Sequence, residues 1–143
     1  MNQAIALAKE AAEDGEVPVG AVVVLDGKIV GAGRNRREIS KNALAHAEIE
    51  AINEACRALG GWRLWQCDMY VTLEPCPMCT GAIINSRIKR LVYGASDYKA
   101  GSCGSVVDLF SLPYNHKPEV VSGVMQEECA ALLTDFFKKL RKK

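Results

Sequence analysis

The chain has 143 residues, a length that fits one domain with a sizeable hydrophobic core rather than two catalytic units. Its composition, 49% hydrophobic and 24% charged, argues against a disordered, fibrous or membrane-spanning protein. The net charge is +1, but residues 134–143 hold five basic residues and one acidic, so this end carries +4 and the remainder −3. Such an end is either a solvated helix terminus or an arm that contacts nucleic-acid phosphates.

The start of the chain predicts the compartment, and the compartment predicts the state of the cysteines. Lys9 and Glu10 follow a short apolar stretch that lacks the basic start and long apolar centre of a signal peptide, so we expect a cytoplasmic protein. Cysteines in that compartment stay reduced, and clustered ones indicate metal or redox chemistry. Only two of the six are clustered. The isolated ones are expected to be small buried hydrophobic residues: Cys56, Cys67, Cys103 and Cys129.

The first half of the chain predicts a helix, a hairpin and a second helix. Apolar residues at helical spacing indicate a helix over residues 2–14 that ends at Gly15. Two β-branched runs, 17–25 and 28–30, flank an Asp-Gly pair typical of a hairpin turn. Residues 31–43 are predicted as a loop, and a second helix begins near residue 45 or 46 and ends at two glycines.

The second half alternates strands with helices. Strands are predicted over 68–73, 88–93 and 119–122, and helices over 77–85, over 106–110 and from about 125 into the basic tail up to 143. Strands that alternate with helices after an opening hairpin predict a mixed sheet with helices on its faces. The fold class is therefore α/β, a single domain over residues 1–143 with a central mixed five-stranded sheet.

Two short sequences carry the chemistry: HxE at His46 and Glu48, and PCxxC, which holds Cys76 and Cys79. Imidazole nitrogen and thiolate sulfur are ligands that Zn²⁺ prefers, and a helix start favours thiolate over thiol. Three protein ligands leave the fourth tetrahedral position for water, as in catalytic zinc sites. Glu48 is then placed to take a proton from that water. Because residues two apart face different sides of a regular helix, we expect His46 and Glu48 at the helix start.

Other interpretations of the same residues stay open. A lone CxxC is also typical of a thioredoxin-like redox pair, although such a pair has no use for HxE. A closed structural zinc site needs a fourth ligand, which Cys56, Cys67, Cys103 or His116 can supply in principle. The conjunction of HxE with PCxxC is what favours a catalytic metal.

These motifs resemble those of the cytidine-deaminase-like superfamily. In that superfamily the His of HxE and the two Cys of PCxxC bind zinc, and the Glu of HxE transfers protons. The segments around them resemble its bacterial tRNA adenosine deaminase branch: residues 17–22, 35–36, 45–49, 70–79, 86–88, 93–95 and 128–133. The resemblance runs along nearly the whole chain. It implies a three-layer α/β/α fold.

The resemblance also implies an activity, hydrolytic deamination of the wobble adenosine of a tRNA anticodon to inosine. It assigns one Zn²⁺ per subunit to His46, Cys76 and Cys79, and the proton shuttle to Glu48. The tRNA anticodon stem-loop is the implied partner, and a homodimer the implied assembly. The implied contacts with substrate, besides the basic residues of the tail, are Asn35, Asp97, Lys99, Asn115 and Phe137.

The resemblance implies the type of reaction more firmly than it implies the identity of the substrate. Similar enzymes deaminate a free nucleobase or nucleoside such as guanine, and a non-catalytic zinc or RNA-binding module is an alternative of a different class. The basic, aromatic tail favours tRNA, because a single base has no phosphates to contact. The sequence departs from many relatives at residues 42–44, Asn-Ala-Leu, just before the HxE segment.

Overall fold

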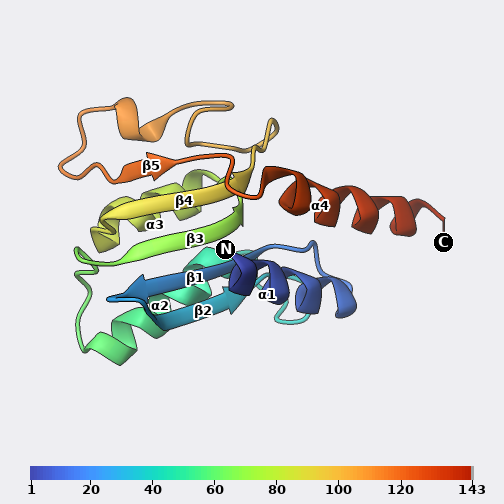
Figure 1. Ribbon diagram of the computed structural model, residues 1–143, viewed down its shortest axis with the longest axis horizontal. Coiled ribbons are helices and arrows are strands. Elements are labelled where there is room, and N and C mark those ends of the chain that lie inside the picture. The colour runs from blue at the N-terminus through green and yellow to red at the C-terminus, as the bar shows by residue number, and fades with distance from the viewer. Residues whose placement is uncertain (143) are drawn as a thin grey trace.

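The computed structural model describes residues 1–142, which form a five-stranded sheet between two layers of helices (Figure 1). The predicted α/β layered fold is therefore confirmed, and the last residue of the predicted basic helix, Lys143, lies outside the described residues. No helix within residues 1–142 combines the length and the apolar run needed to cross a membrane. The elements in chain order are α1 (Asn2–Glu13), β1 (Gly20–Leu25), β2 (Lys28–Arg34), α2 (Ala47–Leu59), β3 (Asp68–Leu73), α3 (Pro77–Ser86), β4 (Arg90–Ala95), the 3-10 helix η1 (Leu109–Ser111), β5 (Glu119–Val121) and α4 (Gln126–Arg141).

The sheet has the strand order β2-β1-β3-β4-β5. β1 pairs antiparallel with both β2 and β3, whereas β3, β4 and β5 run parallel. α3 makes the crossover between β3 and β4, so the carboxyl ends of these two strands meet at one edge. Loops that leave this edge are where α/β proteins commonly place a ligand site.

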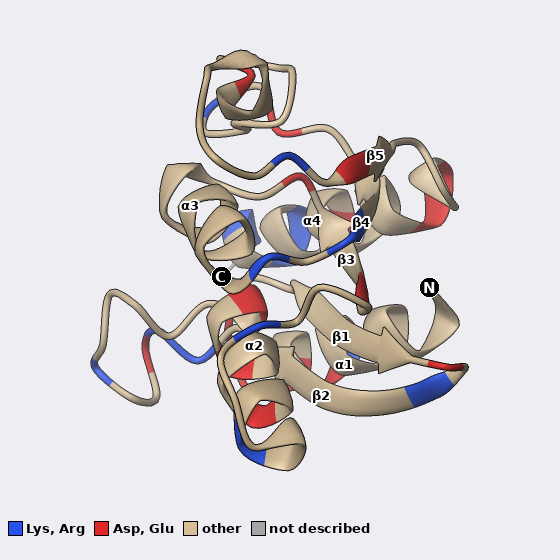
Figure 2. Ribbon diagram, turned by 90° about the vertical axis from the view of Figure 1, so that its left-hand side faces the viewer, with Lys and Arg blue, Asp and Glu red and all other residues tan. Residues whose placement is uncertain are grey.

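Helices cover both faces of the sheet. α2 and α3 lie against one face and α1 and α4 against the other, which Figure 2 shows nearly edge-on. The alternation of β3 sends Met69 and Val71 toward α2 and α3, where they share a buried cluster with Leu91 of β4 and Ile83 of α3. This core fixes the two helices whose first residues build the site.

β2 differs from the sequence prediction, because it continues through residues 31–34, which we predicted as loop. Two glycines so close together are typical of a loop, but Gly31 and Gly33 lie in the strand directly beneath α2. A Cβ at either position would collide with the backbone of α2, at Ala51 or Ala47. The glycines therefore allow a close approach of helix to strand, and they set where α2 begins.

Smaller differences concern element ends. β1 begins at Gly20 rather than 17, and β4 covers 90–95 rather than 88–93. The helix predicted over 106–110 is a single 3-10 turn over 109–111, because the Asp108 side chain accepts a hydrogen bond from the N–H of Phe110 and caps it there. These shifts leave the order of the elements unchanged.

Candidate active site

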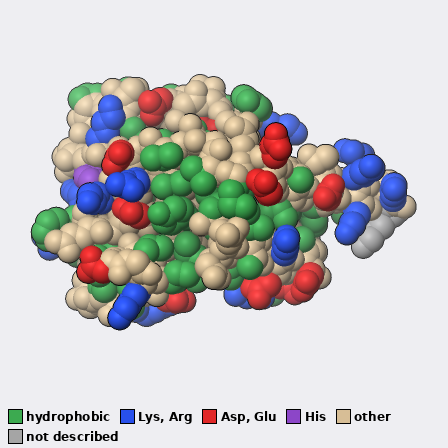
Figure 3. Space-filling view, in the orientation of Figure 1, with side chains coloured by type: hydrophobic (Ala, Val, Ile, Leu, Met, Phe, Trp, Pro, Cys, Tyr) green, Lys and Arg blue, Asp and Glu red, His purple; other side chains and the backbone are tan. Residues whose placement is uncertain are grey.

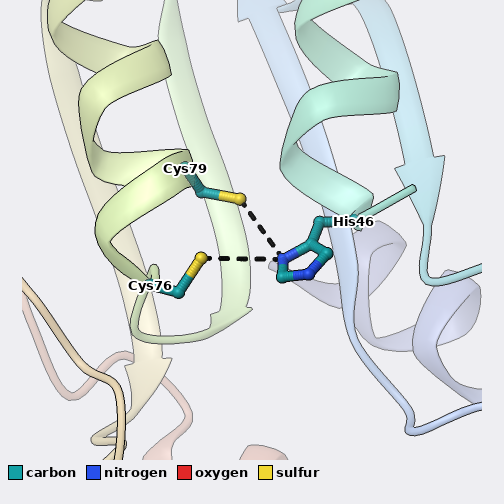
Figure 4. A group of neighbouring side chains, drawn as sticks. All are labelled: His46, Cys76 and Cys79. Atoms are coloured by element: carbon teal, nitrogen blue, oxygen red, sulfur yellow. Dashed lines mark hydrogen bonds between the residues drawn. The ribbon is translucent and has the colours of Figure 1, made fainter. Parts of the chain in front are cut away.

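Three potential metal ligands converge where α2 and α3 begin side by side. His46 is the N-cap of α2, Cys76 is the N-cap of α3, and Cys79 lies in the first turn of α3, after Pro77. The Nδ1 atom of His46 lies 3.7 Å from Sγ of Cys76 and 3.5 Å from Sγ of Cys79 (Figure 4). All three donor atoms lie within 4.8 Å of one another. The predicted placement of His46 and Glu48 at a helix start is confirmed by the N-cap position of His46.

The separations of these atoms fit a tetrahedral zinc ion. Zn–N and Zn–S bonds of about 2.0 and 2.3 Å at a tetrahedral angle place nitrogen and sulfur about 3.5 Å apart. The two nitrogen–sulfur distances, 3.7 and 3.5 Å, lie within about 0.2 Å of that value. The donor set is one imidazole and two thiols, a combination that suits Zn²⁺ better than hard, oxygen-preferring cations.

The two thiols divide one proton between them. Hydrogen bonds with Cys79 and, to a smaller extent, with His46 together lower the pKa of Cys76 to about 4, against the effect of burial. The same hydrogen bond, together with burial, raises the pKa of Cys79 far above that of an ordinary thiol. The hydrogen bond with Cys76 raises the pKa of His46. At neutral pH the site therefore already holds one thiolate, the form that binds metal.

Glu48 lies in the first turn of α2, two residues after His46, and only 4% of its surface is exposed. Burial disfavours its charged form and raises its pKa to about 7. A carboxyl group with that pKa can both accept and donate a proton near neutral pH.

The metal-ligand group opens into a pocket of about 200 Å³. The pocket brings together His46, Cys76 and Glu48 with two of the predicted substrate contacts, Asn35 and Asp97. The other lining residues are Val17, Val19, Arg37, Ala47, Leu73, Glu74 and Ala100.

The two substrate contacts predicted in the pocket are held by backbone hydrogen bonds. Nδ2 of Asn35 donates to the carbonyl oxygen of Val17 at 3.1 Å, and its Oδ1 accepts from the N–H of Arg37 at 3.2 Å. Oδ1 of Asp97 accepts from the N–H groups of Lys99 and the next residue, at 3.0 and 3.2 Å. The side chain of Lys99 is exposed on this same loop, next to the pocket.

Two predicted contacts lie away from the pocket. Asn115 is exposed and precedes β5, at the amino end of β4, opposite to the edge that holds the pocket. Its neighbour His116 hydrogen-bonds through Nε2 to the carbonyl oxygen of Ile88 at 2.7 Å. Phe137 lies on α4, 41% exposed, with its ring edge-on to Phe136 at 5.3 Å.

The remaining cysteines do not complete a closed site. All six cysteines are free thiols, and among residues 1–142 the metal-ligand group consists of His46, Cys76 and Cys79. Cys103 is buried, and its Sγ lies 3.4 Å from the hydroxyl of Thr80. The other three isolated cysteines are Cys67 and Cys129, which are buried, and Cys56, which is partly exposed.

Glu74 was not identified as a candidate site residue from the sequence. It directly follows β3, two residues before Cys76, and is 2% exposed. Burial alone would raise the pKa of its carboxyl group, but hydrogen bonds from Ser105, Asp97 and Cys103 lower it below its usual value. The sequence does offer one signal, a charged residue directly after a buried strand. Its hydrogen-bond partners lie 23 to 31 residues further along the chain, so the sequence alone does not identify them.

His46, Cys76 and Cys79, beside the buried Glu48, are the residue types that zinc-dependent nucleobase deaminases use. The chain belongs to the family described as MafB19-like deaminase, whose model matches residues 1–141. Within it, the chain is one of the tRNA-specific adenosine deaminases. It is 51% identical to the tRNA-specific adenosine deaminase of Bacillus subtilis (strain 168), over 100% of this chain and 89% of the relative.

Solved structures agree with this family. One is a tRNA:A34 deaminase studied for A-to-I editing at the wobble position of transfer RNA. It has a TM-score of 0.90 and 48% identity over 93% of this chain and 97% of that chain. The guanine deaminase of Bacillus subtilis is also similar, with a TM-score of 0.66 and 34% identity over 99% of this chain and 91% of that chain. The fold is thus shared by enzymes that act on different substrates.

Proposed function

We propose that this protein hydrolytically deaminates the wobble adenosine of a tRNA anticodon to inosine, releasing ammonia. The observation that carries the proposal is Glu48, buried in a pocket beside three convergent metal ligands, in a chain 51% identical to a tRNA-specific adenosine deaminase. Residues 1–143 are one deaminase domain, which acts in the cytoplasm as a homodimer, as the family resemblance implies. An intact Glu48 argues against a non-catalytic zinc or RNA-binding module.

His46, Cys76 and Cys79 hold one Zn²⁺ in this proposal. A zinc ion so held lowers the pKa of a bound water, which makes a nucleophile available near neutral pH. The two helix starts present partial positive charge to the thiolate sulfurs and help to keep them deprotonated.

Glu48 moves the protons of the reaction. Its carboxylate accepts a proton as water adds to C6 of the adenine ring, and it delivers that proton to N1. It then takes the proton of the new C6 hydroxyl and passes it to the amino group, the C6–N bond breaks as the C6 carbonyl forms, and ammonia leaves with inosine as the product. A pKa of about 7 suits both directions of transfer.

Recognition divides between the pocket and the surface around it. Asn35 and Asp97 line the pocket, where Asn35 hydrogen-bonds the base that has left the anticodon stack. Lys99, on the exposed side of the same loop as Asp97, contacts phosphate. Asn115 is predicted to contact RNA beyond the base in the pocket.

The basic end of α4 supplies further contacts with RNA. α4 projects beyond the sheet at the edge where β3 and β4 end (Figure 1), and Lys and Arg side chains gather at its far end (Figure 3). Phe137 is exposed there and can stack on an unpaired base. The basic residues of the last turn are Lys138, Lys139 and Arg141.

Deamination of a free base such as guanine is the second candidate, favoured by the 34% identity to a guanine deaminase. One experiment separates the two. An anticodon stem-loop RNA with adenosine at the wobble position is incubated with the protein beside free adenosine, guanine and cytidine, and zinc is measured on the same sample. Inosine in the stem-loop alone, at about one zinc per chain, is the expected result. Ammonia from guanine with an unmodified stem-loop would assign the guanine reaction instead.

A further inference from the structure

We propose that Glu74 is a positioning residue that fixes the loop of residues 97–105, hereafter the 97–105 loop, in the shape that receives RNA. This inference rests on the proposed function, because it assigns a role in binding the same substrate. Glu74 directly follows β3 and lines the pocket, two residues before Cys76. The hydrogen bonds that its carboxylate accepts, however, come from the 97–105 loop and not from His46, Cys76 or Cys79.

Both oxygens of this carboxylate are fully used. Oε1 accepts hydrogen bonds from the N–H of Asp97, at 3.1 Å, and from the hydroxyl of Ser105. Oε2 accepts from the N–H of Cys103, at 3.0 Å, and from the N–H of Ser105, at 3.1 Å. Four donors from one loop therefore meet one buried anion, and no lone pair is left over for a substrate proton.

The loop is built tightly around this anion. A Cβ at position 101 would collide with the carboxyl group of Glu74 and with the carbonyl oxygen of Asp97, so Gly101 lets the backbone pass. The N–H of Ser102 donates to the carbonyl oxygen of Pro75 at 2.9 Å. The chain segment that ends in Cys76 is thus also the segment on which the 97–105 loop is fixed.

The loop needs such an anchor because residues close together in it face different surroundings. Asp97 forms part of the pocket wall, whereas Lys99, two residues on, is exposed to solvent. The buried carboxylate accepts hydrogen bonds from both arms of the loop, at residue 97 and at residues 103 to 105. It therefore fixes the position of the exposed turn between the two arms relative to the pocket. We therefore expect Glu74 to act on RNA binding and not on proton transfer.

The test variant is Glu74→Gln, which keeps the shape of the side chain but replaces one acceptor oxygen by an amide that faces donors. KM for the wobble-adenosine stem-loop is expected to rise about tenfold, in the range seen when groups that orient a site are replaced. kcat is expected to stay within about threefold, because Glu48 and the metal ligands are intact. Zinc per chain should be unchanged.

Two further measurements separate positioning from general loss of stability. Ile88→Val, in the fully buried core at the opposite end of β4, is the control: it lowers the melting temperature without touching the loop, and KM should not change. In the double variant of Glu74→Gln with Lys99→Ala, the effects on KM should be less than additive, because a displaced loop no longer presents the lysine. Additive effects would overturn the proposal.

Hydrogen exchange gives a readout that does not depend on activity. In Glu74→Gln the amides of Asp97, Cys103 and Ser105 should exchange about tenfold faster or more, while those of α2 and β1 keep their protection. Unchanged exchange in the loop would overturn the role of Glu74. A wild-type protein that leaves the stem-loop unmodified would overturn the proposed function instead, and the exchange result would still stand.

Discussion

Replacing Glu48 by Gln separates the two contributions this residue makes, one to catalysis and one to the stability of the metal-free protein. Glutamine has nearly the same shape, but it cannot carry a proton between water and the adenine ring. We expect zinc to remain bound, because His46, Cys76 and Cys79 are untouched. Turnover should fall by about 10²–10⁴-fold or more, the usual contribution of a general acid–base residue.

The same substitution should stabilise the protein once zinc is removed. Burial raises the pKa of Glu48 to about 7 from an ordinary 4.5. At pH 8 the carboxyl group is charged in the folded and unfolded states alike, and keeping that charge buried costs about 3 kcal/mol. Below pH 4.5 it is protonated in both states and the cost disappears. The advantage of the glutamine variant is therefore full above pH 7 and declines as the pH falls toward 4.5.

The assay is thermal unfolding of zinc-free wild type and variant, in the presence of a chelator, at pH 8 and pH 5. A difference of about 3 kcal/mol corresponds to about 10 °C in melting temperature for a chain of this size. At pH 5 the difference should shrink to about 1 kcal/mol. If the variant has no advantage at pH 8, or the same advantage at both pH values, then the charge on Glu48 is not held in a dry site and the assigned role is wrong.

Three other variants test the metal ligands, the helix placement and the tail. Cys79→Ala should purify with far less than one zinc per chain by metal analysis and without activity, since it removes one of three ligands; a zinc-replete variant would show that this cysteine is not a ligand. Gly33→Ala should lower the free energy of unfolding by about 1–3 kcal/mol because its Cβ meets the α2 backbone, whereas Gly61→Ala, with open space around it, should be close to neutral in denaturant unfolding. Lys138→Ala with Lys139→Ala should weaken stem-loop binding and reduce the slope of log affinity against log salt by about 1.4 to 1.8, and an unchanged slope would mean that the tail is only a solvated end.

The sequence predicted the elements better than their ends. Periodicity and the Asp-Gly turn identified all five strands, since these signals are local, but they did not predict the order of the strands in the sheet. β2 was cut short because Gly31 and Gly33 were interpreted as loop residues. Their reason is tertiary, the approach of α2 to the strand, and a single sequence does not display which helix will lie over which strand.

The motifs of the candidate site were predictable from the sequence, whereas the contacts that depend on the fold were not. His46, Glu48, Cys76 and Cys79 could be singled out because each half of the group is a short pattern, HxE or PCxxC, whose chemistry is specific, and the structure brings the three possible metal ligands together. Glu74 was not found, because its role depends on backbone donors that only the fold brings to it. Asn115 was expected to contact the substrate from resemblance alone, which did not say where it lies; the parallel pairing of β4 with β5 places it at the end of the sheet opposite to the pocket.

The ligands occupy positions that helices ordinarily reserve for their own stability. His46 and Cys76 are N-caps, yet neither makes a side-chain hydrogen bond to its helix start, and a Ser or Asp there would contribute about 1 kcal/mol. α2 and α3 therefore each begin without a side-chain cap, at a residue that could instead bind metal. An ion bound at both starts would link segments 30 residues apart in sequence, one long-range contact in place of two local caps. Chelation should accordingly loosen the first turns of both helices together, before the rest of the sheet.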